Sequence, residues 1–222
     1  MNRLAAGLTL GLVAAAPAAL AFDPAHLEQL NTTLRCLNCD LSGIDLAGRD
    51  LTGVYLTYAN LEGATLAGAN LTNGYLRFGR LSGTDFSGTN LTNTNLESAD
   101  LAGSNLTGAI LVDASFINTT AGGAIFDDAD MTRANLTRTL LRAASLRRAD
   151  LTGANVSAAI LSNADLSGAV LRGARIDRSN FSGANLTDAD LTGANVTATT
   201  LTAATLCRTI MPDGAVSNAN CQ

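Results

Sequence analysis

Few side chains in this sequence could carry catalysis. The 222 residues include a single His, His26, and all fourteen basic residues are Arg. A nucleophile–His–acid site needs a His beside its nucleophile, and no such motif surrounds His26. Schiff-base chemistry and phosphate-binding loops both need a Lys, which the chain lacks. We therefore expect no enzyme and no cofactor.

The nineteen Asp and Glu residues make the chain acidic, with a net charge of −5. An acidic balance is the opposite of a nucleic-acid-binding footprint, so we expect no nucleic-acid partner. Asp recurs at one repeated position where Asn often replaces it, as in Asp100 and Asn105. This exchange is typical of residues that form turns, and not of paired catalytic carboxyls.

Four cysteines offer redox or metal chemistry as an alternative to structure. Cys36-Leu37-Asn38-Cys39 has the spacing of a redox pair, but it lacks a thioredoxin-like strand and helix around it. It also lacks the second pair that a zinc site needs, and only His26 lies near it in sequence. Four cysteines in an exported chain favour two disulfides, for which three pairings exist.

The first twenty-one residues have the features of an export signal. Arg3 precedes an apolar run over residues 4–16, and residues 19–21 form a small-x-small cleavage site. The run is short for a membrane span, although a retained anchor is the alternative. We expect a signal peptide over residues 1–21, no membrane span in the mature chain, and a periplasmic or secreted location.

The elements that must position these side chains follow a five-residue repeat. Every fifth residue from Leu41 to Leu206 gives thirty-four positions, of which twenty-five are Leu. The residue two before is small in thirty-one cases, and the residue one before is Asp or Asn in nineteen. A period of five fits neither a helix nor a flat strand. It predicts a narrow coil with one large and one small inward residue per repeat, stabilised by stacking on its neighbours.

Charged residues indicate how many repeats complete one circuit, because residues one circuit apart lie about 4.8 Å from each other. At a spacing of twenty there are six opposite-charge pairs and one like-charge pair, whereas fifteen gives four of each. Opposite charges on facing rungs are favourable. Four repeats per circuit are therefore predicted, with these pairs: Arg77/Glu97, Arg80/Asp100, Asp113/Arg133, Asp127/Arg147, Asp128/Arg148 and Asp188/Arg208.

The repeated Ala-(Asp/Asn)-Leu-x-x unit, held in phase from Leu41 to Leu206, resembles the pentapeptide-repeat family. The resemblance implies an all-β fold, a right-handed quadrilateral parallel β-helix. About eight and a half circuits make a rod roughly 40 Å long. Ala121 stands in a Leu position and is followed by two glycines, so we expect a bulge or a softer rung over residues 117–125.

The two ends of such a rod need covering, because they expose unpaired strand edges. Asp23-Pro24 and the helical spacing of the following leucines predict a short helix, so residues 22–40 form an N-terminal cap. Residues 207–222 form a C-terminal cap loop. The length of the rod separates the cysteines at its ends too far for a bridge. We therefore expect disulfides Cys36–Cys39 and Cys207–Cys221, the latter closing the C-terminal cap.

Four outward aromatic residues form two pairs spaced by twenty: Tyr55 with Tyr75, and Tyr58 with Phe78. We name these four residues the aromatic quartet. Clustered exposed aromatics suit contact with a protein or a sugar-like ligand. The alternative is a ladder that stiffens the first coils or supports the N-terminal helix. Leu140 and Ile160, again twenty apart, could form a weak dimer contact, so the chain is expected to be a monomer or a weak dimer.

These observations predict a non-enzymatic, exported structural or protein-interaction solenoid with an unknown protein partner. The resemblance implies the thylakoid lumen as the location if the host is photosynthetic. It also implies an alternative, a DNA mimic that interacts with a topoisomerase, since some family members present an acidic rod to gyrase. A signal peptide argues against that alternative, because it takes the protein away from DNA. A band of Arg residues between 133 and 178 also interrupts any acidic track.

Overall fold

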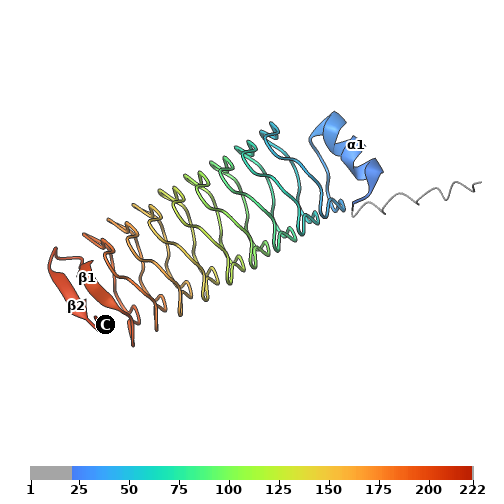
Figure 1. The fold of residues 1–222 in the computed structure, drawn as a ribbon. Helices are drawn as coiled ribbons and strands as arrows, with labels where there is room; N and C mark the ends of the chain where they lie inside the picture. Colours follow the sequence, from blue (N-terminus) through green and yellow to red (C-terminus); the bar gives the residue numbers. More distant parts are fainter. Residues whose placement is uncertain (1–21, 222) are drawn as a thin grey trace, which may run out of the picture.

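The computed structural model describes residues 22–221 as an elongated solenoid with a helix at one end and a two-stranded sheet at the other (Figure 1). Helix α1 spans Pro24–Thr33, strand β1 spans Leu206–Ile210 and strand β2 spans Val216–Ala219. The predicted signal peptide, residues 1–21, lies outside the described residues. Within them, no helix combines the length and apolarity that crossing a bilayer requires.

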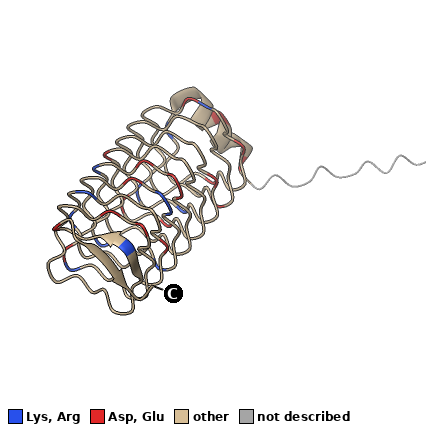
Figure 2. Ribbon diagram, turned by 60° about the vertical axis from the view of Figure 1, so that its left-hand side comes forward, with Lys and Arg blue, Asp and Glu red and all other residues tan. Residues whose placement is uncertain are grey.

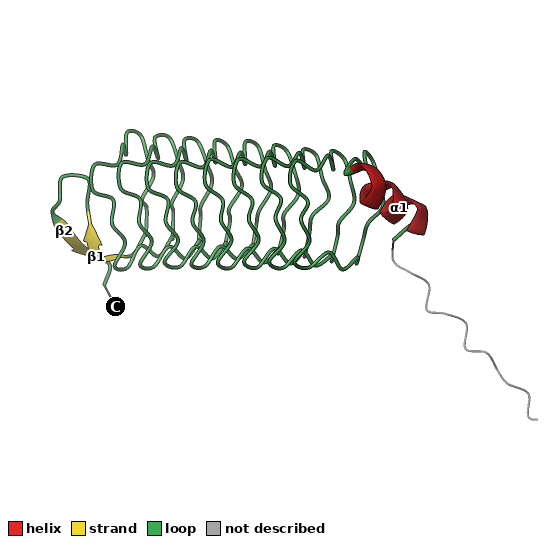
Figure 3. Cartoon of the chain, turned by 90° about the horizontal axis from the view of Figure 1, so that it is seen from above, coloured by secondary structure: helices red, strands yellow, loops and turns green. Residues whose placement is uncertain are grey.

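Isolated parallel bridges form the wall of the solenoid. Each joins a residue to the one twenty positions later, from Arg35 on the first coil to Ile210 on the last. Four pentapeptides therefore complete one circuit, as the charge spacing predicts, and the coils follow one another along the rod (Figure 3). The ladder begins at Arg35, so Cys36 and Cys39 take inward positions within the segment predicted as the N-terminal cap.

One repeat, Ala99-Asp100-Leu101-Ala102-Gly103, shows how the backbone is satisfied without long strands. The N–H groups of Leu101 and Gly103 donate to the next coil, and that of Asp100 donates to the previous one. The Ala99 N–H closes the preceding corner, and the Ala102 N–H donates to Oδ1 of Asp100. All five donors of the repeat thus have acceptors, which is what burial of a backbone requires.

The Asp and Asn residues support the corners without forming them. We call the residue before the inward Leu the wall position and the second residue after it the corner position. Corner residues such as Gly103 have positive φ, and the N–H that follows donates to the Leu carbonyl, the pattern of a type II turn. The wall Asp or Asn instead accepts from the N–H two residues on. The wall Asp and Asn residues therefore support the turn from outside it, whereas the sequence pattern predicted that they form the turn.

The core is a column of fully buried large side chains, mostly Leu, with a small residue beside each. Buried hydroxyls at the small position would cost stability if they were unpaired. Thr84, Thr119 and Ser179 each donate to the carbonyl of the inward residue twenty-three positions earlier, on the preceding coil. These three buried hydroxyls therefore add links between coils.

The bulge expected at residues 117–125 does not occur. Ala121 is buried in its inward position, its N–H donates to the Leu140 carbonyl, and Gly123 has the positive φ of other corners. Phe116 and Phe126, the inward residues on either side of Ala121 in sequence, meet edge to face with ring centroids 6.0 Å apart. Their larger rings compensate for the small Ala side chain, so the rung stays regular.

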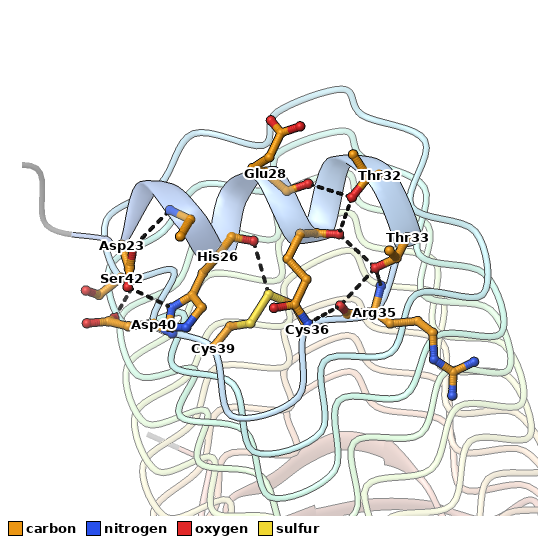
Figure 4. The surroundings of a disulfide bond; sticks show 12 residues. Asp23, His26, Glu28, Thr32, Thr33, Arg35, Cys36, Cys39, Asp40 and Ser42 are labelled. Atoms are coloured by element: carbon orange, nitrogen blue, oxygen red, sulfur yellow. Dashed lines mark hydrogen bonds and ion pairs between the residues drawn. A yellow bond between two sulfur atoms is a disulfide. The ribbon is translucent and has the colours of Figure 1, made fainter.

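Helix α1 lies across the open end of the first coil (Figure 4). Asp23 caps it by accepting from the Ala25 N–H, and Leu30 is completely buried against the core. His26 Nδ1 accepts from the Asp40 N–H at 3.1 Å, which ties the helix to the first coil. A disulfide joins Cys36 to Cys39 beneath the helix.

Strands β1 and β2 pair antiparallel at the other end, with Leu206 opposite Ala219 and Ile210 opposite Val216. The segment predicted as a C-terminal cap loop is therefore largely a hairpin. A disulfide links Cys207, on β1, to Cys221, just beyond β2. The hairpin and helix α1 together cover the two ends of the solenoid (Figure 1).

Five of the six predicted ion pairs join neighbouring coils; they are Arg77–Glu97, Arg133–Asp113, Arg147–Asp127, Arg148–Asp128 and Arg208–Asp188. The sixth prediction, Arg80/Asp100, is wrong. Arg80 instead makes a bidentate contact with Glu62 at 2.8–2.9 Å through Nη2. Asp100 has a shorter side chain, which is held on its own corner by the Ala102 N–H.

Candidate functional site

The aromatic quartet forms two stacked pairs on the outside of the first coils. The rings of Tyr55 and Tyr75 are 4.6 Å apart and nearly parallel, and those of Tyr58 and Phe78 are 4.8 Å apart. Tyr55 and Tyr75 occupy wall positions, whereas Tyr58 and Phe78 occupy corner positions with positive φ. A bulky residue in this backbone conformation is strained, so the corner pair is held against an energetic preference for Gly.

Two Arg side chains border the quartet. The Arg35 guanidinium lies over the Tyr55 ring at 4.2 Å from its centroid, and that of Arg77 lies 5.1 Å from the centroid of Phe78. Arg77 also pairs with Glu97 at 3.0 Å. The guanidinium of Arg35 has no carboxylate partner among residues 22–221, so it is the uncompensated charge of this surface.

Leu37 extends the quartet toward helix α1, and sequence reasoning missed it. Its side chain is 60% exposed, and it borders a pocket of about 420 Å³ with Gln29, Thr33, Arg35 and Tyr55. Leu37 lies between Cys36 and Cys39, and the spacing of these two cysteines suggested redox or metal chemistry for the segment. The sequence did contain a signal for Leu37. It lies twenty residues, or one coil, before Thr57, which stands between Tyr55 and Tyr58, so Leu37 lies beside the quartet.

The cysteines are structural in this arrangement. Cys36 and Cys39 are buried in inward positions and are bonded to each other. Among the described residues no cluster of His, Cys, Asp or Glu could hold a metal ion. A redox or zinc role for the Cys36-x-x-Cys39 segment therefore has no geometric support in this part of the chain.

The carboxylates act as hydrogen-bond acceptors that hold coils together. A hydrogen bond from Arg133 lowers the pKa of Asp113, and one from Ser157 lowers the pKa of Asp177. At Asp127, burial raises the pKa, but hydrogen bonds from Arg147 and Ser145 outweigh it and the net shift is downward. Groups shifted in this direction stay ionised at neutral pH, which does not suit a general acid.

Leu140 and Ile160 face each other across neighbouring coils through a parallel bridge, and the Leu140 side chain is exposed. The dimer contact suggested by their spacing stays a prediction. Acidic and basic residues occur together along the solenoid (Figure 2), and within residues 22–221 eight Arg–carboxylate ion pairs form.

The chain is similar to a known protein family and to several solved structures. The family model described as pentapeptide repeats matches eight copies over residues 35–73, 75–108, 109–148, 144–188 and 184–220. A separate comparison with curated proteins found no match.

Several solved structures are similar. HetL from the cyanobacterium Nostoc, a pentapeptide repeat protein involved in regulating heterocyst differentiation, is 31% identical with a TM-score of 0.50, and the match covers 86% of this chain and 97% of HetL. A pentapeptide repeat protein from the thylakoid lumen of Arabidopsis thaliana is 35% identical over 53% of this chain and 68% of its own, with a TM-score of 0.30. QnrB1, a plasmid-mediated fluoroquinolone resistance protein, is 20% identical over 71% of this chain and 88% of its own, with a TM-score of 0.46.

Proposed function

Because the chain belongs to the pentapeptide-repeat family, whose members are right-handed β-helical solenoids, we propose that it is an exported, non-enzymatic protein that binds another protein through the aromatic quartet and Leu37. The solenoid supplies a rigid frame, and the quartet supplies the contact surface. The chemistry of the partner follows from this surface.

The observation that carries this proposal is the concentration of exposed large apolar side chains on the first coils. Leu37, Tyr55, Tyr58, Tyr75 and Phe78 all lie there with at least a third of their surface exposed. Elsewhere on the solenoid wall such residues occur singly, as at Ile110 and Ile125. Exposed aromatic clusters of this kind are typical of protein interfaces, where rigid rings contribute large contact area at low entropic cost.

The charges around the quartet define the partner. Arg35 has no carboxylate partner among residues 22–221, and its guanidinium lies over the Tyr55 ring. A partner that offers an apolar groove with a carboxylate at its edge would pair with Arg35 and cover the quartet. We therefore favour an acidic rim around an apolar groove as the complementary surface.

Export is supported by the residues at both ends of the chain. The leader-like segment at residues 1–21 precedes a domain whose four cysteines are all in disulfides. Disulfides of this kind persist in oxidising compartments and are rare in the cytosol. The DNA-mimic alternative gains no support, because the Arg–carboxylate pairs break up any continuous acidic track.

Site-specific photocrosslinking in the host tests the interface. A benzophenone amino acid replaces Tyr58, and the matched control replaces Asn163, which has the same positive-φ corner backbone on another side of the coil. We expect one discrete crosslinked protein from position 58 and none from position 163. The purified partner should then bind Arg35→Glu at least tenfold more weakly than the native chain.

Two results would contradict the proposal. Equal crosslinking from both positions would show that the quartet is not a specific surface. A lower melting temperature of Tyr55→Ala with unchanged affinity for the purified partner would show that the stacked rings only stiffen the first coils. Export is tested separately by fractionation and mass measurement, which should find a chain that begins at Phe22 outside the cytoplasm.

A further inference from the structure

A second cavity opens on the far side of the aromatic quartet from helix α1. It has a volume of about 330 Å³ and is lined by Asn73, Tyr75, Asn93, Asn95, Asp113 and Ser115. This size lies at the lower end of the range for small-molecule sites, about 300–1,000 Å³, and suits a single ring. The cavity adjoins Tyr75 but none of the other aromatic residues.

The ring of Tyr75 lines this cavity on one side. Tyr55 covers one face of the Tyr75 ring at 4.6 Å, and it comes from the preceding coil. The remaining lining residues, apart from Asn73, come from the two coils that follow Tyr75. The cavity therefore lies on the side of the Tyr75 ring opposite Tyr55. Asn95 takes the next rung of the same column. A ligand ring can therefore contact the outer part of the Tyr75 ring, which projects beyond the shorter Asn95 side chain.

The polar lining offers hydrogen-bonding groups that have no partner in the described chain. On other sides of the solenoid, some wall Asn residues, such as Asn105 and Asn185, donate Nδ2 to an Asp on the preceding coil. Asn95 has Tyr75 at that place, so its Oδ1 accepts from the Glu97 N–H while Nδ2 is left unpaired. The hydroxyl of Ser115, one coil further, also has no partner.

Two corner residues, Asn73 and Asn93, supply further unpaired hydrogen-bonding groups at the edge of the cavity. Asn93 donates Nδ2 to Oδ1 of Asn73 at 2.7 Å, which leaves Nδ2 of Asn73 and Oδ1 of Asn93 available. Asp113 is fully engaged, because Arg133 contacts both of its carboxylate oxygens. The cavity thus combines an aromatic face, amides and a hydroxyl, and it contains no uncompensated charge.

We propose that this cavity binds one pyranose ring of a neutral glycan. A pyranose has an apolar C–H face that can lie on the Tyr75 ring, and a rim of hydroxyls that both donate and accept. Amides and a hydroxyl at the edges of the ring match that rim, and the balanced charge favours a neutral sugar over an anion or a cation. This site goes beyond the proposed protein interface and does not depend on it.

Tyrosine fluorescence of the purified mature protein provides the test. The chain has no Trp and only three Tyr, so Tyr75 is one of three sources of the signal, with Tyr55 stacked on it and Tyr58 close by. The probes are linear tetrasaccharides of glucose and of N-acetylglucosamine, with a galacturonic acid tetramer as the charged comparison. We expect a saturable change with a neutral tetrasaccharide and a response at least tenfold weaker with the charged one.

Matched variants assign the response to the cavity. Tyr75→Ala and Asn95→Ala should each weaken binding at least tenfold, with binding to Tyr75→Ala followed by calorimetry because its reporter is gone. Tyr58→Ala and Asn135→Ala should stay within twofold. Asn135 shares the wall position and the Oδ1 contact of Asn95 but lies outside the cavity. Ser115→Ala and Tyr75→Phe, which keep the fold's packing, should give intermediate losses.

The absence of a saturable response with both neutral tetrasaccharides would overturn the proposal. So would preferential binding of the charged tetramer, or equal losses at Asn95 and Asn135. Because the titration uses no partner protein, its failure leaves the crosslinking result at Tyr58 untouched. Failure of the crosslinking experiment likewise leaves the titration intact.

Discussion

Replacement of Asp127 by Asn tests whether buried carboxylates hold the coils together. Asp127 is only 4% exposed, and it accepts from Ser145 Oγ, from the Arg147 N–H and from Nε of Arg147 at 2.8 Å. Hydrogen bonds to a charged group contribute about 1.5–3 kcal/mol each. Asn preserves the shape and one acceptor oxygen but places an amide donor against the guanidinium. We expect the variant to lose about 1.5–3 kcal/mol of unfolding free energy.

The matched control is Asp128→Asn on the same corner. Asp128 pairs with Arg148 at the same spacing of twenty, but both side chains are about half exposed. Water and salt screen such a pair, so its loss should barely change the urea midpoint. Urea unfolding followed by circular dichroism measures both variants. Equal losses at Asp127 and Asp128, or a larger loss at Asp128, would refute the reasoning.

Acid should erase the difference between native chain and Asp127→Asn. Burial raises the pKa of Asp127, but hydrogen bonds from Arg147 and Ser145 lower it further, so the folded value lies below the ordinary 3.8. The folded state then binds fewer protons than the unfolded chain. The contribution of Asp127 is present above the unfolded pKa and is lost as pH falls through the folded pKa. The gap in stability between the two proteins should therefore be constant near neutrality and close only below about pH 4.

Four further substitutions test the corners, the core and the C-terminal end of the solenoid. Gly123→Ala should cost about 1–2 kcal/mol by urea unfolding because its φ is +65°. Gly122 has a negative φ, and a Cβ there would make an ordinary contact of 3.7 Å with the Arg142 carbonyl oxygen, so Gly122→Ala should be neutral or gain up to about 1 kcal/mol. Equal effects of the two substitutions would contradict the corner geometry. Ala121→Leu should cost about 1–3 kcal/mol by overpacking, and a gain would reveal a void beside Ala121. Cys221→Ser should cost about 3 kcal/mol of unfolding free energy, because it opens the loop that the disulfide closes to Cys207. Amide hydrogen exchange should become faster only in β1 and β2. Faster exchange throughout the solenoid would contradict the idea that this hairpin opens independently of the coils.

The periodic residues made most of the fold predictable. A large residue every fifth position with a small one two before it has one efficient burial pattern, so the coil follows from Leu41 onward without knowledge of contacts. The period of twenty was readable from charges because side chains at equal positions on neighbouring coils are adjacent. The same argument paired Tyr55 with Tyr75 before their rings were seen to stack.

The two wrong predictions, the Arg80/Asp100 ion pair and the bulge at residues 117–125, share a physical cause. Sequence spacing does not report how far a side chain reaches or how much space its neighbours fill. Arg80 is long enough to contact Glu62, eighteen positions away, so the spacing of twenty named the wrong carboxylate. Ala121 was expected to distort its rung because its own volume is small. The compensating rings belong to Phe116 and Phe126, and only three-dimensional packing shows that they meet.

The glycan cavity was beyond sequence reasoning for a different reason. Asn95 has the same type and repeat position as many wall residues, and a sequence pattern marks it as structural. What distinguishes Asn95 is the aromatic residue on the preceding coil, which places its unpaired amide beside the ring of Tyr75. Sites of this kind arise where two repeat columns of different chemistry meet.

The circuit of twenty residues limits how this chain can gain or lose length. Deleting one whole lap would shorten the rod and keep every outward column aligned above its former neighbour. Deleting a single pentapeptide between Phe78 and Asn93 would instead turn everything downstream by a quarter of a revolution, and would carry Asn95 and Ser115 away from the ring of Tyr75. Natural length variants that keep both surfaces should therefore differ by multiples of a lap.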